Sequence, residues 1–403
     1  MKYVVIVPDG MADRPLKELG GKTPLMVAYK PNMDRLASEG IVGVVRTIPE
    51  GLYPGSDVAN LNILGYDPKR YYTGRAPLEA ASMGIKLGEG DVAYRCNLVT
   101  LHFNKDRTRA VMDDYSAGHI STEEARELIK ALNEELADNS ISFYPGVSYR
   151  HLMVWKNGIE ECECIPPHDI TGKDITDYLP TGKADEILKN LMIRSVPVLE
   201  AHPVNRARIS KGLKPANSIW LWGQGKRPVM PSLKERYGLN GAIISAVDLT
   251  KGIGIYAGMK VINVPGATGY IDTNYIGKAE YGITSLQEAD LVYIHIEAPD
   301  EASHEGNIEK KIKAIEDIDA LVIGTVLRML KSHEQYRILI LPDHATPISV
   351  RTHVDEPVPF ILFDSTKRNK NSIKYDESIV EAKDLLRIEE GHRLLDLLIK
   401  GAV

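Results

Sequence analysis

Short apolar runs bounded by polar residues mark both ends of the chain. Each run is rich in β-branched residues and leads directly into turn-forming residues, which is typical of buried strands in a parallel sheet. The runs are Tyr3–Val7, Leu291–Ile296, Arg337–Leu341 and Val358–Phe363. Apolar positions at three- and four-residue spacing predict helices over Glu309–Lys331 and Pro31–Ser38. Because a strand, a crossover helix and a second parallel strand form a βαβ unit, the pattern predicts an α/β fold for these parts.

The middle of the chain has a different pattern. Strand-like runs over Val92–Leu101 and Ser148–Trp155 flank a helix predicted at Thr122–Leu136. We therefore expect a discontinuous α/β core of residues 1–72 and 216–403, with a parallel-rich central sheet flanked by helices. An α+β domain of residues 73–215 is inserted into it, and Lys214–Asn217 is the predicted return linker.

Composition narrows the class of partner. The chain has 403 residues with 49 Lys and Arg against 55 Asp and Glu, a formal charge of −6. This mild acidity argues against nucleic acid as the main partner, but allows a small anionic substrate bound by a local cationic cluster. No apolar stretch is long enough to cross a membrane, and the first one is too short for a signal peptide. Three cysteines cannot form a disulfide framework, so we expect a cytoplasmic protein.

Three of the predicted strands lead into side chains that can bind metals. Asp9 follows the first strand, Asp300 and His304 follow the second, and Asp343-His344 closes the third, with His353 a short loop later. A single aspartate after a strand is usually a turn former. Together, however, these residues lie at the carboxyl ends of parallel strands, where α/β folds place their sites. Such a mixed oxygen and nitrogen set suits Mn²⁺, Zn²⁺ or Co²⁺.

Ser56 is the candidate nucleophile. It follows the turn Pro54-Gly55 and opens a helical pattern, a position where serine is ordinarily an N-cap. The same position lets the start of a helix receive a phosphate group. A metal ion beside the hydroxyl would lower its pKa and prepare it for attack on phosphorus.

The order of the candidate metal ligands and Ser56 along the chain resembles that of the two-metal core of the alkaline phosphatase superfamily. The residues are Asp9, Ser56, Asp300, His304, Asp343, His344 and His353. Longer strings resemble the archaeal-type 2,3-bisphosphoglycerate-independent phosphoglycerate mutases. They are Pro8–Asp13, Pro31–Asp34, Pro54–Asp57, Leu64–Pro68, Tyr72–Arg75 and Arg95–Leu98. The resemblance covers nearly the whole chain. It implies interconversion of 3-phosphoglycerate and 2-phosphoglycerate, in glycolysis or gluconeogenesis, through a phosphoserine intermediate.

The resemblance also implies roles for individual residues. One divalent ion would be held by Asp300, His304 and His353, and the second by Asp9, Asp343, His344 and the nucleophile Ser56. Mn²⁺ is the expected ion, with Zn²⁺, Co²⁺ and Mg²⁺ as alternatives. Lys251 is the match for a lysine that neutralises phosphate. The predicted substrate-binding residues of the inserted domain are His119, Arg150, Asp169, Arg206 and Arg208.

Two other activities are compatible with the same metal core. A bacterial branch that shares the string Tyr53–Asn60 has been proposed to phosphorylate homoserine, and this sequence resembles that branch. A phosphatase would pass the phosphoryl group to water instead. The homoserine alternative would differ from the mutase only in the substrate pocket of the inserted domain, where residue spacing is not diagnostic.

Overall fold

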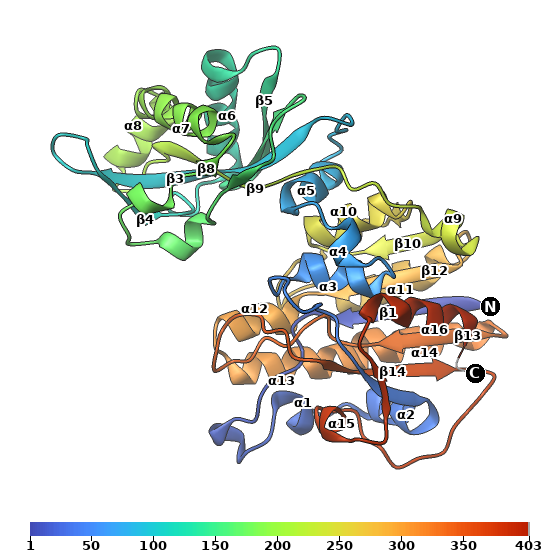
Figure 1. The fold of residues 1–403 in the computed structure, drawn as a ribbon. Helices are drawn as coiled ribbons and strands as arrows, with labels where there is room; N and C mark the ends of the chain where they lie inside the picture. Colours follow the sequence, from blue (N-terminus) through green and yellow to red (C-terminus); the bar gives the residue numbers. More distant parts are fainter. Residues whose placement is uncertain (402–403) are drawn as a thin grey trace. The chain divides into compact units, whose positions relative to one another are not determined.

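The computed structural model describes residues 1–401 and divides into two compact units (Figure 1). The core unit consists of residues 1–72 together with the chain from Val229 onward, and the inserted unit is Thr73–Pro228. No helix among residues 1–401 is long and apolar enough to cross a membrane.

An eight-stranded sheet forms the centre of the core unit. In spatial order its strands are β11 (Lys260–Val261), β10 (Gly241–Ile244), β12 (Leu291–Ile296), β1 (Lys2–Pro8), β13 (Tyr336–Ile340), β14 (Val358–Asp364), β2 (Ile41–Val45) and β15 (Leu386–Ile388). Strand β1 pairs in parallel with β12 on one side and β13 on the other, and these are the three strands that lead into the candidate ligands. The predicted α/β fold class is confirmed.

The direction of β14 differs from the prediction. We expected Val358–Phe363 to be a parallel strand, but β14 is antiparallel to both β13 and β2. The reason lies in the connection, because a parallel strand needs a crossover segment, usually a helix. Residues 341–357 contain turns and isolated bridges but no helix. The chain therefore returns in the opposite direction.

Helices cover both faces of this sheet. Val4 and Ile6 of β1 belong to a buried cluster with α2 (Pro31–Glu39), α11 (Tyr275–Ser285), α13 (Ile308–Asp317) and α14 (Gly324–Met329). On the other face, the Tyr3 hydroxyl contacts the Ile399 carbonyl of α16 (Leu394–Lys400). The remaining helical segments of the core unit are η1 (Lys17–Leu19), α1 (Pro24–Val27), α3 (Ser56–Ile63), α4 (Pro68–Tyr71), α9 (Leu233–Tyr237), α10 (Asp248–Tyr256), α12 (Ala298–His304), η5 (Leu330–Ser332), α15 (Ser378–Glu381) and η6 (Gly391–Arg393).

The long helix predicted at Glu309–Lys331 is interrupted by a π-helical turn, η4 (Ile318–Ile323), between α13 and α14. The turn carries the buried Asp319, whose carboxylate accepts the backbone N–H groups of Asn32 and Met33 at 3.1 and 2.7 Å. These N–H groups lie in the first turn of α2 and have no partner within that helix. The irregular turn thus serves to cap a neighbouring helix.

The inserted unit is an α+β structure with an antiparallel sheet. Its strands are β4 (Ala110–Asp114), β3 (Val92–Phe103), β6 (Arg150–Trp155) and β5 (Ile141–Val147), with β9 (Ser218–Lys226) also paired to β3. A small second sheet joins β7 (Cys162–Glu163) to β8 (Thr181–Gly182). The helical segments are α5 (Arg75–Ser82), α6 (Thr122–Leu136), η2 (Pro167–Ile170), η3 (Thr176–Tyr178), α7 (Asp185–Glu200) and α8 (Pro203–Ser210).

The inserted unit extends beyond the boundary that the sequence indicated. We placed its end at residue 215 because Lys214–Asn217 has the composition of a linker. In the structure β9 follows that segment and pairs with β3 from Val92 to Val99, so the unit ends at Pro228. The apolar run Ile219–Trp222 shows that a buried strand follows, but not which sheet it joins.

Candidate active site

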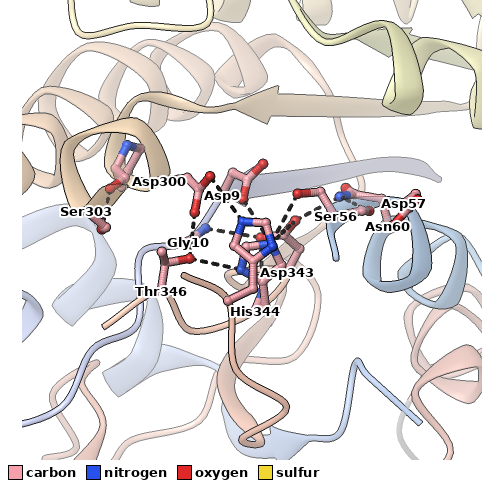
Figure 2. A network of polar contacts seen from close by, with 12 residues as sticks. Asp9, Gly10, Ser56, Asp57, Asn60, Asp300, Ser303, Asp343, His344 and Thr346 are labelled. Carbon is pink, nitrogen blue, oxygen red and sulfur yellow. Dashed lines mark hydrogen bonds and ion pairs between the residues drawn. The ribbon is translucent and has the colours of Figure 1, made fainter. Parts of the chain in front are cut away.

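The carboxyl ends of β1, β12 and β13 bring the candidate ligands together. Three groups have ligand atoms within 4.8 Å of one another, and together they contain Asp9, His295, Asp300, His304, Asp343, His344 and His353. Figure 2 shows Asp9, Asp343 and His344 around one point, with Ser56 approaching from the start of α3. We name Asp300, His304 and His353 the outer half of the site, and Asp9, Asp343 and His344 the inner half.

In the outer half, one carboxylate is neutralised by two imidazoles. His304 Nε2 and His353 Nε2 lie 3.0 and 3.5 Å from Asp300 Oδ2, and the Thr346 hydroxyl donates to Oδ1 at 2.5 Å. Burial opposes ionisation of Asp300, but the two histidines outweigh it and hold its pKa well below the usual range. Burial likewise opposes charge on His304, but Asp300 raises its pKa to about 9. A protonated imidazole therefore balances the carboxylate when no cation is bound.

In the inner half, a buried carboxylate has no such balance. Asp9, Asp343 and His344 are all 0% exposed. Both oxygens of Asp9 lack a hydrogen-bond partner. Burial, and next the negative charge of Asp343, raise the pKa of Asp9 well above its usual range. Burial also lowers the pKa of His344 to about 4, so the ring is a neutral ligand at pH 7. Orphaned carboxylate oxygens beside a neutral imidazole fit a divalent cation.

Backbone and amide groups fix the second carboxylate of the inner half. Asp343 Oδ1 accepts the N–H groups of Gly10 and His344 at 3.1 and 3.0 Å, and Oδ2 accepts the Asn60 amide at 2.9 Å. Gly10 has φ +62°, and a Cβ there would lie 2.4 Å from Asp300 Oδ1. This turn after β1 therefore requires glycine, because a larger residue would displace the outer-half carboxylate.

Ser56 is the first residue of α3 and does not cap it. The N-cap position is Gly55, and the side-chain contact of Ser56 is with His344, whose Nε2 lies 3.1 Å from Oγ. Asn60, one turn later, donates to the Ser56 carbonyl at 2.7 Å as well as to Asp343, and accepts the Tyr293 hydroxyl at 2.5 Å. This amide therefore ties the start of α3 to the inner half.

The sequence interpretation did not identify His295, Asn60 and Thr346 as parts of the site. His295 lies inside the apolar strand β12, where its neighbours predict only a buried strand. In the sequence, the one signal that could have identified it is a histidine within an otherwise apolar run. Lys251, the predicted phosphate-binding lysine, lies on α10, which packs against α3. Its Nζ is 3.4 Å from Asp248 Oδ1 on the same helix.

Three of the five substrate candidates in the inserted unit lie along one row of aromatic rings. The row consists of Tyr149, Tyr115, His168 and Trp222, with neighbouring ring centroids 5.4–6.0 Å apart. His119 and Arg150 contact Tyr149 at 6.2 and 5.6 Å, and Asp169 Oδ1 is 3.7 Å from His168 Nε2. At the other end Arg95 lies 4.3 Å from the Trp222 ring and forms an ion pair with Glu79 at 3.0 Å. Arg95, His168 and Trp222 were not among our predicted substrate residues.

The other two candidates have protein partners outside this row. Arg208 is 3% exposed and donates to the Ala117 and Lys214 carbonyls and to Glu124. It thereby stabilises the turn at residues 117–119, where all three residues have positive φ. Through this turn Arg208 helps to fix the backbone position of His119. Arg206 is exposed and donates to the Ala201 carbonyl at 2.6 Å. Their roles as substrate ligands stay predictions.

Comparison with known proteins agrees with this geometry. The model of the family described as 2,3-bisphosphoglycerate-independent phosphoglycerate mutase matches residues 37–205. A relative of that name from Methanothrix thermoacetophila is 55% identical over 402 residues, covering 100% of both chains. One from Geobacter sulfurreducens, named as a probable mutase of this type, is 54% identical and covers 99% of this chain and 100% of its own. The chain belongs to this family.

Two solved structures share the fold. The cofactor-independent phosphoglycerate mutase from Thermoplasma acidophilum is 28% identical, with a TM-score of 0.66 and 99% of each chain covered. A protein from Pyrococcus horikoshii is 29% identical, with a TM-score of 0.81, covering 99% of this chain and 96% of its own. The interpretation of the sequence as a phosphoglycerate mutase is confirmed, and the homoserine alternative is not favoured.

Proposed function

We propose that this phosphoglycerate mutase interconverts 3-phosphoglycerate and 2-phosphoglycerate by two phosphoryl transfers through Ser56. The observation that carries the proposal is the position of the Ser56 hydroxyl. It does not cap α3, and it lies 3.1 Å from Nε2 of His344, which with the carboxylate of Asp9 belongs to the inner half. The N-cap position of α3 is Gly55, so the Ser56 hydroxyl has no capping role. It faces a buried set of metal-binding groups instead.

The outer and inner halves would each hold one divalent cation, Mn²⁺ in our proposal, with Zn²⁺, Co²⁺ or Mg²⁺ as alternatives. In the inner half Ser56 Oγ joins Asp9, Asp343 and His344. When bound, such cations neutralise the phosphate and favour the ionised form of the serine hydroxyl. The residues present fit this role, because each half offers at least one buried carboxylate and an imidazole.

The chain's own groups then carry the transfer. Ser56 Oγ attacks the phosphorus in line with the bond to O3 of the glycerate, and that bond breaks. The proton of Ser56 ends on the released O3 hydroxyl. Glycerate reorients, its O2 attacks the phosphoserine, and its proton returns to Ser56. Asn60 holds the Ser56 carbonyl through both steps.

The inserted unit supplies the groups that suit the glycerate carboxylate. Along the aromatic row lie Arg150, His119 and His168, and a guanidinium fork is a good match for a planar anion. We propose that this unit retains glycerate and excludes water while phosphoserine exists. Lys251 would neutralise the substrate phosphate. The three cysteines are free, which is consistent with the cytoplasm, where 3-phosphoglycerate is a glycolytic intermediate.

The decisive experiment gives Mn²⁺-loaded protein either 3-phosphoglycerate or homoserine with a phosphate donor. We expect 2-phosphoglycerate from the first mixture, with phosphate on Ser56 when the turnover is acid-quenched and analysed by mass spectrometry. Ser332→Ala, an exposed serine of the core unit, is the matched control. Phosphate on a histidine, or phosphohomoserine as the main product, would contradict the proposal.

The role of the inserted unit is tested by product ratios. Arg150→Ala should increase the ratio of inorganic phosphate to 2-phosphoglycerate, because glycerate escapes before it is rephosphorylated. Arg194→Ala is the control, since this exposed arginine of α7 bonds to the Glu135 carbonyl and is not among the predicted substrate residues. An unchanged ratio in Arg150→Ala would contradict the role of the unit, whereas the Ser56 mechanism would stand.

A further inference from the structure

His295 lies beside the inner half without belonging to the ligand set proposed above. It is 0% exposed in the central strand β12. Its Nε2 is 3.0 Å from Asp9 Oδ2 and its Nδ1 is 3.1 Å from Ser245 Oγ. Neither Nε2 nor Asp9 Oδ2 has a hydrogen-bond partner elsewhere among residues 1–401. Two buried orphaned atoms therefore face each other, and each can satisfy the other.

Ser245 decides which ring nitrogen carries the proton. Its Oγ accepts the Val247 N–H at 2.9 Å, so its own proton needs an acceptor. Within the described chain, His295 Nδ1 is the acceptor available to it. A buried neutral imidazole has one proton, and with Nδ1 as acceptor that proton is on Nε2. It then lies between Nε2 and Asp9 Oδ2, where a ring protonated on Nδ1 instead would place two acceptors 3.0 Å apart.

The backbone of His295 is fixed as firmly as its ring. The fully buried Lys278 donates from Nζ to the His295 carbonyl at 3.2 Å. In the sheet His295 is paired with Val7 of β1, two residues before Asp9. The ring is thus held at a set distance from the Asp9 carboxylate by the sheet, by Lys278 and by Ser245.

We propose that His295 is a positioning residue, which donates its Nε2–H to Asp9 Oδ2 and leaves Oδ1 free as the ligand atom. Asp9 Oδ1 is the oxygen that lies 3.5 Å from His344 Nε2, on the side of the inner half. A ligating carboxylate commonly has its second oxygen held by such a donor. This inference rests on the proposed cation in the inner half. The competing arrangement, in which His295 is itself a ligand through Nε2, requires the proton to be on Nδ1.

The proton position is measured directly by ¹⁵N NMR of protein labelled in histidine, with the His295 signals assigned through His295→Gln. We expect a protonated Nε2 both without metal and with Zn²⁺, which is diamagnetic. A ring protonated at Nδ1 would overturn the proposal, as would loss of the Nε2 proton on Zn²⁺ binding. This readout does not depend on mutase activity.

Mn²⁺ affinity, measured by calorimetry on metal-free protein, tests the consequence. His295→Leu should weaken binding about 10–100-fold. His295→Gln, whose side-chain amide can donate to Asp9, should stay within about threefold of the wild type. Ser245→Ala should weaken binding and Ser245→Thr should restore it, and these variants decide the matter if His295→Leu does not fold. His151→Leu removes a buried histidine of the inserted unit and should leave affinity unchanged.

The two levels of proposal fail in different ways. Wild-type affinity in His295→Leu would overturn the positioning role while the cation site stands. Absence of Mn²⁺ binding by the wild type would overturn the proposed function, and the proton position would still test the contact between His295 and Asp9.

Discussion

In the outer half of the site Asp300 contacts two imidazoles and a hydroxyl, and Asp300 raises the pKa of His304 to about 9. In the inner half the imidazoles of His295 and His344 lie 3.0 and 3.5 Å from Asp9, and burial keeps both uncharged at pH 7. Both carboxylates are buried, at 3% and 0% exposure. The outer half reaches solvent through His304, whose side chain is 35% exposed, so it can take up a proton in place of a metal ion. Asp9, Asp343 and His344 of the inner half are fully buried, and the neutral imidazoles beside Asp9 do not compensate its charge.

This difference indicates what each half requires from a cation. The outer half is close to electrically balanced in the metal-free protein, and a metal ion must displace protons from it. The inner half keeps a carboxylate that is costly to bury without a counter-charge. We therefore expect substitutions in the two halves to have opposite effects on the stability of the metal-free protein.

The largest effect is expected from Ser56→Ala, which removes the nucleophile of the inner half without changing any charge. It should lower kcat by about 10⁴-fold or more, as the loss of a covalent nucleophile does. Mn²⁺ affinity should change far less, because the carboxylates and imidazoles stay in place. Steady-state kinetics and calorimetry check this, and retention of more than a few per cent of activity would rule out Ser56 as the nucleophile.

Removal of metal should abolish turnover, and Mn²⁺ should restore it. EDTA treatment is expected to reduce activity to background and to lower the thermal unfolding temperature. At 100 times its Kd, Mn²⁺ stabilises the folded state by about 2.7 kcal/mol per independent site. No 2,3-bisphosphoglycerate should be needed at any stage. Full activity in EDTA would contradict the metal-dependent mechanism.

Substitutions of Asp300 and Asp9 should change the stability of the metal-free protein in opposite directions. In metal-free protein at pH 8, Asp300→Asn should destabilise by about 2–4 kcal/mol, because it leaves His304 and His353 without their counter-charge. Asp9→Asn should stabilise by about 1–3 kcal/mol, because it removes a buried unpaired charge. Calorimetric unfolding measures both, with Asp113→Asn of the inserted unit as an exposed control. Destabilisation by both substitutions would remove the proposed contrast.

The smallest effect concerns pH. The pKa of His304 is raised to about 9 by Asp300 against the opposing effect of burial, so its contribution to stability is complete below its ordinary value near 6.5. That contribution is lost as the pH rises through 9. Metal-free wild type should therefore unfold at lower temperature at pH 9.5 than at pH 6.5, and His304→Gln should reduce this difference. The exposed His102→Gln should not alter it.

Local pattern was sufficient for much of the fold and for the outline of the site. The strand Leu291–Ile296 and the helix Thr122–Leu136 have the predicted bounds, because both depend on short-range periodicity and on clear end signals. The structure brings all seven proposed metal-site residues to one edge of the sheet, since each follows a strand or opens a helix there. Their roles as ligands and nucleophile stay predictions until metal binding is measured.

Tertiary structure alone decided which distant segments meet. Arg95 and Trp222 are 127 positions apart and are brought together by the antiparallel register of β3 and β9, which no local pattern encodes. The same pairing moved the boundary of the inserted unit to Pro228, and the lack of a crossover helix reversed β14. His295 reads in the sequence as one more residue of a buried strand. Its partners Asp9 and Ser245 are separated from it by 286 and 50 positions, so only the tertiary structure shows that both contact its ring.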